Sequence, residues 1–279
     1  MVTGIRSDWV GGIVGIRSQP MEARFKRLQR TAITMTRTLF EVSAHADLEG
    51  ARERFAQGGR AQIRDFLTAE SATEILAILK SQTPWGISLQ AGESDTPEQV
   101  RAEDLRDDDM RQHVEARARA THGAAANGQF AFIHARYSLV DAYLGKWDPG
   151  GPHDLLLEYL NAPDFLGPMR YVTGIADVVK ADAHASLFAA GHYLTRHIDK
   201  HSGEGRRVAY VLNFAPEDWY TDWGGYLVFF DKEGDIVEGF RPRFNSLNLF
   251  RVPQAHSVSY VPPFAPAARY AISGWLLDK

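Results

Sequence analysis

Three side chains of metal-binding type are spaced so that a β-sheet could hold one ion between them: His197, Asp199 and the more distant His256. Residues two apart on a strand project from the same face, so His197 and Asp199 can bind one ion together. Two neutral imidazoles and one carboxylate leave coordination positions open, an arrangement that suits non-haem Fe(II) oxygenases. The spacing therefore predicts an iron centre in which these three residues are the ligands and the catalytic residues.

Arg269 stands near the start of the last predicted strand and supplies a permanent cation. Its planar guanidinium fits a carboxylate through two parallel hydrogen bonds. A metal with open positions and a carboxylate clamp together indicate a chelating keto acid, so we predict 2-oxoglutarate as cosubstrate, with Arg269 binding it and O₂ as the oxidant. Trp275 shares the face of Arg269 by the period of two and is expected to pack beneath the metal.

Composition bounds the class of protein. The chain has 279 residues, 44% hydrophobic and 24% charged, which fits one large domain or one domain with an extension. A formal charge of −4 argues against a nucleic-acid partner. The sequence has no cysteine and no apolar run of membrane-spanning length, so disulfides, thiolate sites and membrane insertion are not expected. The first twenty residues make a poor signal peptide, and we expect a cytoplasmic location.

The N-terminal half is predicted to be mainly helical. Residues 21–45 and 47–57 carry apolar residues at helical spacing, so we assign residues 1–58 to an N-terminal helical extension that packs on the domain or forms a homodimer. The oxygenase domain would then cover residues 59–279. It is expected to open with a strand from Ile63 and a helix over 72–80. Helices are expected over 97–120 and 155–165, with a strand over 130–137.

From about residue 176 the sequence pattern predicts short strands separated by turn residues. Eight strands are expected, over 183–190, 194–199, 206–214, 225–231, 236–240, 246–252, 256–261 and 269–277. Such a run of short strands, backed by helices, predicts an α+β fold whose core, about 176–279, is a double-stranded β-helix, or jelly-roll.

Four segments carry a resemblance to a known family: Gly191–Leu194, Arg206–Asn213, Asp222–Leu227 and Arg269–Trp275. In this order and spacing, the chain resembles the Fe(II)/2-oxoglutarate prolyl hydroxylases over about residues 60–279. It resembles most the branch of the ribosomal-protein prolyl hydroxylases, with the hypoxia-sensing enzymes as cousins. The resemblance implies hydroxylation of a prolyl residue in a protein or peptide, with succinate and CO₂ as coproducts and ascorbate as an optional reductant.

The resemblance also bears on residues around the metal. Arg206 aligns with a site-facing arginine of the hypoxia-sensing enzymes, the alternative being a surface cation at a strand end. Tyr193 and Trp223 are candidate substrate contacts, with core packing as the alternative for both. Phe188 and Val211 stand where the family has tyrosines that help to hold the cosubstrate. This part of the 2-oxoglutarate pocket must therefore differ from the family pattern.

Two other functions remain open at this point. The same ligand set could hydroxylate a free amino acid or a small peptide natural product, because the substrate is chosen by loops such as 122–129 and 215–224. A catalytically silent jelly-roll that binds a ligand or docks a partner is the third hypothesis. Fold alone does not decide among them.

Overall fold

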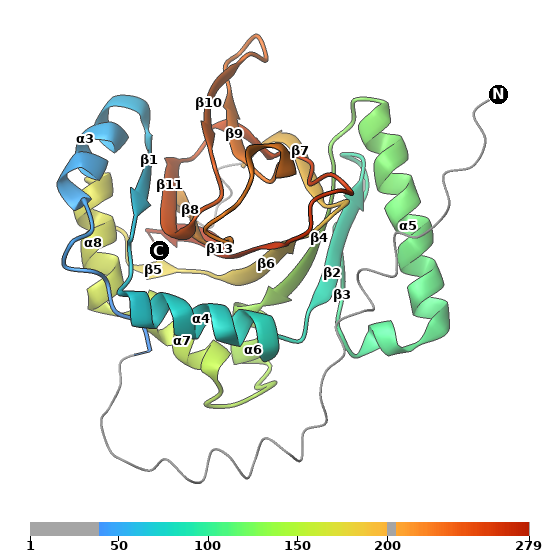
Figure 1. Ribbon diagram of the computed structural model, residues 1–279, viewed down its shortest axis with the longest axis horizontal. Helices are drawn as coiled ribbons and strands as arrows, with labels where there is room; N and C mark the ends of the chain where they lie inside the picture. The colour runs from blue at the N-terminus through green and yellow to red at the C-terminus, as the bar shows by residue number, and fades with distance from the viewer. Residues whose placement is uncertain (1–38, 200–204, 279) are drawn as a thin grey trace. The chain divides into compact units, whose positions relative to one another are not determined.

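The computed structural model describes residues 39–199 and 205–278, which belong to one compact unit beginning at Leu39 (Figure 1). Most of the predicted N-terminal extension therefore lies outside the described residues. Its last part forms helix α3 (Leu48–Gly58), which buries Ala51 and Phe55 in the main hydrophobic core. The helix predicted up to residue 45 is wrong for residues 39–45, where Val42 instead forms an isolated bridge with Leu67.

The C-terminal part is the predicted set of eight strands. Their bounds are β6 (His184–Phe188), β7 (Tyr193–Ile198), β8 (Arg206–Phe214), β9 (Leu227–Phe230), β10 (Ile236–Phe240), β11 (Phe244–Arg251), β12 (Ala255–Val258) and β13 (Arg269–Leu277). They interleave, with β11-β8-β13-β6 side by side in one layer and β7-β12-β9-β10 in the other. All pairings are antiparallel, and strands consecutive in sequence mostly fall in different layers, as in a jelly-roll.

Five further strands extend the first layer. Strand β1 (Arg60–Arg64) pairs with β11, and β5 (Lys180–Ala181) pairs with β13. On the other side β4 (Ala131–Ser138) pairs with β6 and then with β2 (Gly86–Ala91), which pairs with β3 (Glu98–Val100). Strand β4 also pairs with β7 through Phe132 and Ile133 and so links the two layers. The sheet is therefore nearly closed around an interior space.

Helices cover the outer face of the first layer (Figure 1). Beside α3 these are α4 (Ala69–Ser81), α6 (Leu139–Leu144), α7 (Pro152–Leu160) and α8 (Pro163–Thr173). The single helix predicted over 155–165 is wrong, because Pro163 begins a new helix at α8. The helix predicted over 97–120 is also shifted: strand β3 and a 3-10 turn (Asp104–Arg106) precede α5 (Asp108–Ala126).

Strand alternation decides what faces the interior. On β8, Tyr210 and Leu212 are fully buried in the core beneath the helices, and the rings of Tyr210 and Phe165 meet edge to face at 5.7 Å. Their neighbours Val211 and Asn213 therefore face the opposite side of the sheet, toward the second layer. The register places Asn213 opposite Ala271 and Val211 opposite Ser273 on β13. The period of two thus aims Arg269, Ser273 and Trp275 into the same interior.

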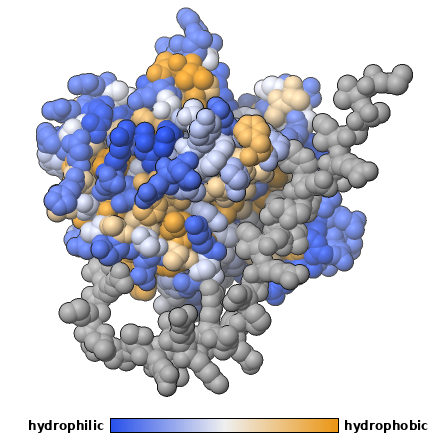
Figure 2. Space-filling view, in the orientation of Figure 1, coloured by the Kyte–Doolittle hydropathy of each residue, from blue (hydrophilic) through white to orange (hydrophobic). Residues whose placement is uncertain are grey.

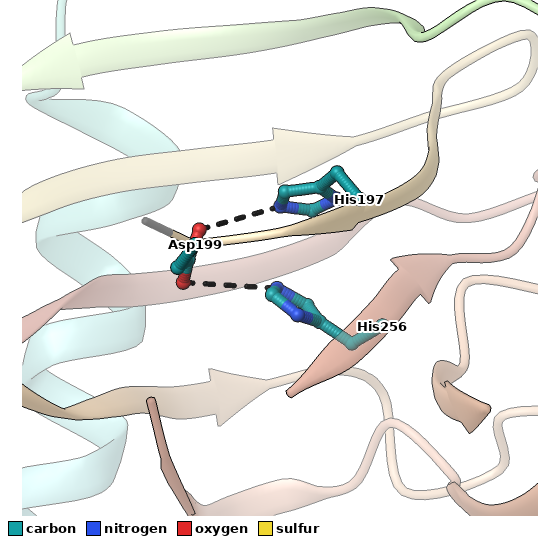
Figure 3. Close-up of side chains that lie close together, drawn as sticks. All are labelled: His197, Asp199 and His256. Atoms are coloured by element: carbon teal, nitrogen blue, oxygen red, sulfur yellow. Dashed lines mark ion pairs between the residues drawn. The ribbon is translucent and has the colours of Figure 1, made fainter. Parts of the chain in front are cut away.

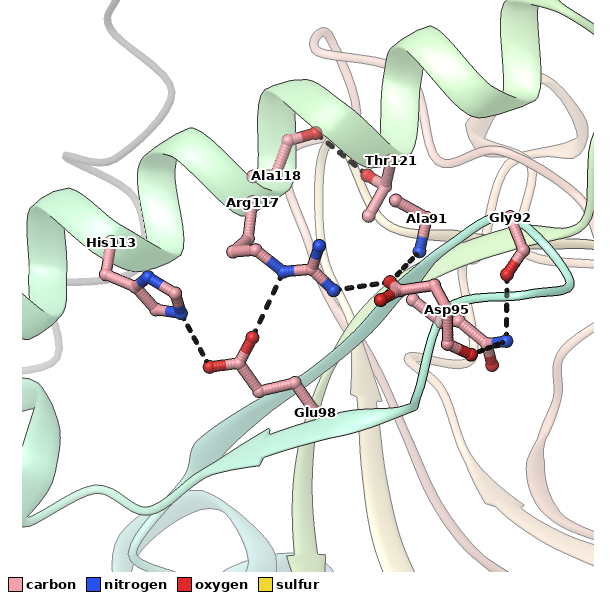
Figure 4. A network of polar contacts seen from close by, with 9 residues as sticks. Ala91, Gly92, Asp95, Glu98, His113, Arg117, Ala118 and Thr121 are labelled. Atoms are coloured by element: carbon pink, nitrogen blue, oxygen red, sulfur yellow. Dashed lines mark hydrogen bonds and ion pairs between the residues drawn. The ribbon is translucent and has the colours of Figure 1, made fainter.

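A polar network fastens α5 to the β2–β3 hairpin (Figure 4). Arg117 bridges two carboxylates: its Nε donates to Glu98 at 3.1 Å, and its Nη2 pairs with Asp95. His113 contacts the other oxygen of Glu98 at 2.8 Å. The hydrogen bond from the backbone of Ala91, followed by Arg117, holds the pKa of Asp95 below its ordinary value. One guanidinium therefore joins the helix to β3 and to the turn between β2 and β3.

Arg117→Met is expected to lower the free energy of unfolding by about 1–2 kcal/mol, because two partly buried carboxylates lose charge-assisted hydrogen bonds. Urea unfolding measures this loss, and hydrogen exchange should show it concentrated in α5 and the β2–β3 hairpin. Arg119→Met, on an exposed position of the same helix, is the matched control. Equal unfolding midpoints for the two variants would show that the bridge contributes nothing.

Polar residues predominate on the face shown in Figure 2, and hydrophobic residues gather there in separate patches. Among the helices of the described ranges, none combines the length and the apolar character needed to cross a membrane.

Candidate active site

The three predicted ligands come together inside the sheet (Figure 3). His197 on β7 and His256 on β12 are directly opposite each other in the strand register, and their rings lie 4.2 Å apart. Asp199 follows β7 immediately; its Oδ1 lies 3.5 Å from His197 Nε2, and its Oδ2 lies 3.9 Å from His256 Nε2. One ligand atom from each residue falls within 4.8 Å of the others. In the described part of the chain this is the one such group of three.

Hydrogen bonds fix which imidazole nitrogen is free to bind a metal. His197 Nδ1 lies 3.0 Å from the Thr195 carbonyl oxygen, and His256 Nδ1 lies 2.9 Å from that of Gln254. A carbonyl only accepts, so each Nδ1 carries the proton and donates it. Each Nε2 therefore keeps its lone pair toward Asp199, the orientation that metal-binding histidines take.

The charge states also suit a divalent cation. Burial lowers the pKa of His256 to about 4, so its imidazole is neutral at physiological pH. Burial acts to raise the pKa of Asp199, but His197, His256 and Trp275 outweigh it and hold that pKa below its ordinary value. A carboxylate and two neutral imidazoles are the forms in which these groups bind metal. The donor set thus fits an Fe(II)-sized ion.

Aromatic rings enclose the triad and fix the carboxylate. Phe130 lies 5.3 Å from the His197 ring, and Phe250 lies 4.5 Å from the His256 ring. Trp275 Nε1 donates to Asp199 Oδ2 at 3.1 Å, in agreement with its predicted place beneath the metal. The guanidinium of Arg206 lies 3.9 Å over the Trp275 ring. Arg206 therefore contacts Trp275, which in turn contacts the predicted metal ligand Asp199.

Arg269 is a buried cation at the start of β13, with only 2% of its surface exposed. Its Nε donates to Asn213 Oδ1 at 3.1 Å, and its Nη1 donates to the Gly225 carbonyl at 2.7 Å. Burial lowers its pKa to about 10, so it stays charged at neutral pH. No acidic residue of the described ranges forms an ion pair with it. The cation is thus held in place by neutral acceptors and lacks a counter-ion of its own.

Of the two departures from the family pattern, Phe188 lies beside this cation, whereas Val211 is opposite Ser273, four residues further along β13. Phe188 is directly opposite Arg269 in the register, and the guanidinium lies 5.3 Å from its ring. The Phe188 ring also stacks on His134 of β4, with the ring centroids 4.9 Å apart. His134 was missed from the sequence because it precedes the jelly-roll, and only the β4–β6 pairing brings it here. An imidazole thus lies beside Phe188, the residue that stands at the position of the family tyrosine.

Tyr193 and Trp223, the predicted substrate contacts, have mainly aromatic neighbours. Tyr193 is buried in the apolar cluster beneath α5, 5.4 Å from the His122 ring. Trp223 meets Trp219 edge to face at 5.6 Å and packs against the cluster that contains Phe188. Their substrate roles stay predictions.

Buried neutral histidines give the fold an acid sensitivity. Burial lowers the pKa of His134 to about 3 and that of His192 to about 4, from an ordinary 6.5. Below pH 6.5 these histidines bind protons in the unfolded chain but stay neutral in the folded chain. The free energy of unfolding therefore decreases as the pH is lowered, by about 1.4 kcal/mol per pH unit for each group.

We expect His134→Phe to lose less stability than wild type when the pH is lowered from 7.5 to 5. Urea unfolding at both pH values measures this, with exposed His45→Gln as control; a wild-type pH response in His134→Phe would contradict it.

Comparison with known proteins agrees with this geometry. Residues 183–277 match the family model of the 2OG-Fe(II) oxygenase superfamily. The match covers the jelly-roll region that contains the triad and Arg269. No curated protein matches the chain by sequence.

Three solved structures share the fold. A prolyl-4-hydroxylase from Pseudomonas putida is 20% identical with TM-score 0.51, covering 83% of this chain and 99% of that chain. A prolyl hydroxylase from Trichoplax adhaerens, in complex with a hypoxia inducible factor oxygen degradation domain peptide fragment, is 17% identical with TM-score 0.53, covering 83% and 89%. A 2OG-Fe(II) oxygenase family oxidoreductase from Burkholderia pseudomallei is 11% identical with TM-score 0.53, covering 84% and 92%. The predicted α+β jelly-roll is thereby confirmed.

Proposed function

We propose that this protein is an Fe(II)- and 2-oxoglutarate-dependent oxygenase that hydroxylates a prolyl residue of a protein or peptide. In this proposal His197, Asp199 and His256 bind the metal, and Arg269 binds the far carboxylate of the cosubstrate. The observation that supports it most strongly is that a triad of metal-ligand type, with His256 buried and the other two residues partly buried, occurs together with a buried arginine. This arginine has no acidic partner among the described residues. A catalytically silent module has no need of both.

In this proposal the protein's own residues bind and orient the metal and the cosubstrate and shield them from water. Two neutral imidazoles and one carboxylate leave open positions for a chelating cosubstrate. Arg269 balances a carboxylate in a site from which water is excluded, and Asn213 and Gly225 keep its guanidinium in place. Trp275 keeps the Asp199 carboxylate turned toward the histidines. When bound, Fe(II) with 2-oxoglutarate supplies O₂ activation for C–H hydroxylation, with succinate and CO₂ as coproducts.

The prolyl substrate is supported by the neighbours in fold and by exposed aromatic side chains. Two of the structures compared above are prolyl hydroxylases, one of them bound to a peptide fragment. Tyr220 is 61% exposed and lies 6.2 Å from the Trp223 ring, which offers a surface on which a proline ring could stack. Membership of the ribosomal-protein branch, the cytoplasmic location and a homodimer through the N-terminal region rest on the sequence alone.

Succinate formation from 2-oxoglutarate tests the proposal, with Fe(II) under air, for wild type beside His197→Ala. We expect iron-dependent succinate from the wild type and, because a metal ligand is lost, at least about a hundredfold less from the variant. A proline-containing peptide should raise the wild-type rate and gain the mass of one oxygen atom. Absence of 2-oxoglutarate binding to the Mn(II)-loaded wild type, measured by calorimetry, would overturn the proposal.

A further inference from the structure

A cavity of about 120 Å³ lies at the C-terminal end of β4, where the starts of β2 and α6 and the end of β3 meet. Its lining includes Gly86, Arg101, Glu103, Arg106, Arg136 and Trp147. None of the triad residues lines it, and neither does Arg269, Asn213 or Phe188. The cavity is therefore separate in its lining from the metal and cosubstrate sites.

Arg136 of β4 is the unusual member of this lining. Its Nε is fully buried and has no hydrogen-bond partner. Within the described ranges its guanidinium forms no ion pair; the carboxylates of Asp141 and Asp182 act on its charge only from a distance. A buried guanidinium nitrogen without an acceptor is costly to the fold, and native proteins normally supply a partner. Arg136 thus indicates an acceptor that the described residues do not provide.

The other charged residues of the cavity do not neutralise this excess. Glu103 pairs with Arg101 at 2.7 Å, and the Arg101 guanidinium lies 3.9 Å over the Trp147 ring. Arg106 is exposed at the cavity, and no carboxylate of the described chain pairs with its side chain. The one acid of the lining therefore offsets one of three arginines.

Glycine at position 86 allows the backbone of Val100 to form one wall of the cavity. A Cβ at Gly86 would lie 2.1 Å from the carbonyl oxygen of Val100, a distance that no side chain tolerates. Gly86 is also the register partner of Arg136 across the β2–β4 pairing. The end of β3 can therefore lie directly against residue 86, the neighbour of Arg136, only because residue 86 has no side chain.

From these observations we infer that the cavity is a binding site for a compact oxyanion, a carboxylate or a phosphate, held by Arg136 and Arg106. The cavity has room for a phosphate ion or a short carboxylic acid. Guanidinium groups bind both kinds of oxyanion through paired hydrogen bonds. The site is independent of the proposed oxygenase chemistry.

Thermal unfolding of the full chain tests the inference. The protein is titrated with inorganic phosphate and, separately, with acetate, each against sodium chloride of equal ionic strength. A ligand that binds only the folded state raises Tm saturably, here by about 2–6 °C at high occupancy. Wild type should show this rise with at least one oxyanion, and the more effective of the two identifies the ligand as phosphate or carboxylate.

Variants locate the effect. Arg136→Met should remove the rise, Arg106→Gln should weaken the apparent affinity about tenfold, and Arg119→Gln should leave it unchanged. Arg269→Gln should keep the rise in Tm, because Arg269 belongs to the proposed cosubstrate pocket and not to this cavity. The anion site and the proposed oxygenase function can therefore fail independently of each other. If Arg136→Met does not fold, Arg106→Gln decides. Absence of a saturable rise beyond sodium chloride, or a rise that persists in the arginine variants at 106 and 136, overturns the inference.

Discussion

His256→Ala is expected to bind Mn(II) at least about a hundredfold more weakly than wild type and to form no iron-dependent succinate. Loss of a group that merely supports a metal ligand already costs 10–100-fold in affinity. His256 is placed as a ligand itself, with its Nε2 turned toward Asp199 and its Nδ1 proton donated to Gln254. The remaining imidazole and carboxylate cannot form the three-residue set that holds the ion.

The variant should remain folded, since the ring it loses is a neutral one. His256 is 5% exposed and packs 4.5 Å from Phe250, so its truncation leaves a small cavity and costs about 1–3 kcal/mol of unfolding free energy. His192→Ala is the matched control, because His192 is equally buried and lies outside the triad. Electron paramagnetic resonance of Mn(II) measures binding in both. Equal weakening in the control would assign the loss to general damage and contradict the metal role of His256.

Most of the correct predictions about the fold and the site came from the alternation of residues along the strands. The period of two placed His197 with Asp199 and Arg269 with Trp275, and both pairs share an interior in the structure. The turn residues between the eight strands predicted the bounds of the strands closely, because the residue types at a turn determine where each strand ends. The distant His256 was predicted from residue type, whereas its register opposite His197 is a property of pairing between layers.

The parts that sequence could not supply depend on contacts between distant segments. His134 reaches Phe188, and thus the cosubstrate pocket, only through the β4–β6 pairing. Gly225 holds Arg269 with a backbone carbonyl, a group that every residue has and no side-chain pattern reveals. The sequence predicted one long helix over 97–120, but the first residues of that range instead form β3, because pairing with β2 outweighs local propensity.

Arg269→Gln is expected to raise the dissociation constant for 2-oxoglutarate by about 30- to 3,000-fold, while Mn(II) binding stays near the wild-type value. Truncating one partner of a buried, hydrogen-bonded charge pair costs about 2–5 kcal/mol, which converts to this range. The glutamine amide can still donate to Asn213 or Gly225, but it carries no charge for the cosubstrate carboxylate. The metal ligands lie on other strands and keep their own hydrogen bonds.

The stability of the same variant distinguishes a ligand anchor from a structural cation. In the absence of cosubstrate, Arg269 is a desolvated charge with no acidic partner in the described chain, so replacing it should leave the unfolding temperature unchanged or higher. Saturating 2-oxoglutarate with Mn(II) should then stabilise wild type and have little effect on the variant. Calorimetric titration and thermal unfolding measure the two effects, with Arg54→Gln, at a half-exposed arginine paired to Asp47, as control. Wild-type affinity in Arg269→Gln, or a loss of stability of the apoprotein without a loss of affinity, would show that Arg269 serves the fold and that the cosubstrate is anchored elsewhere.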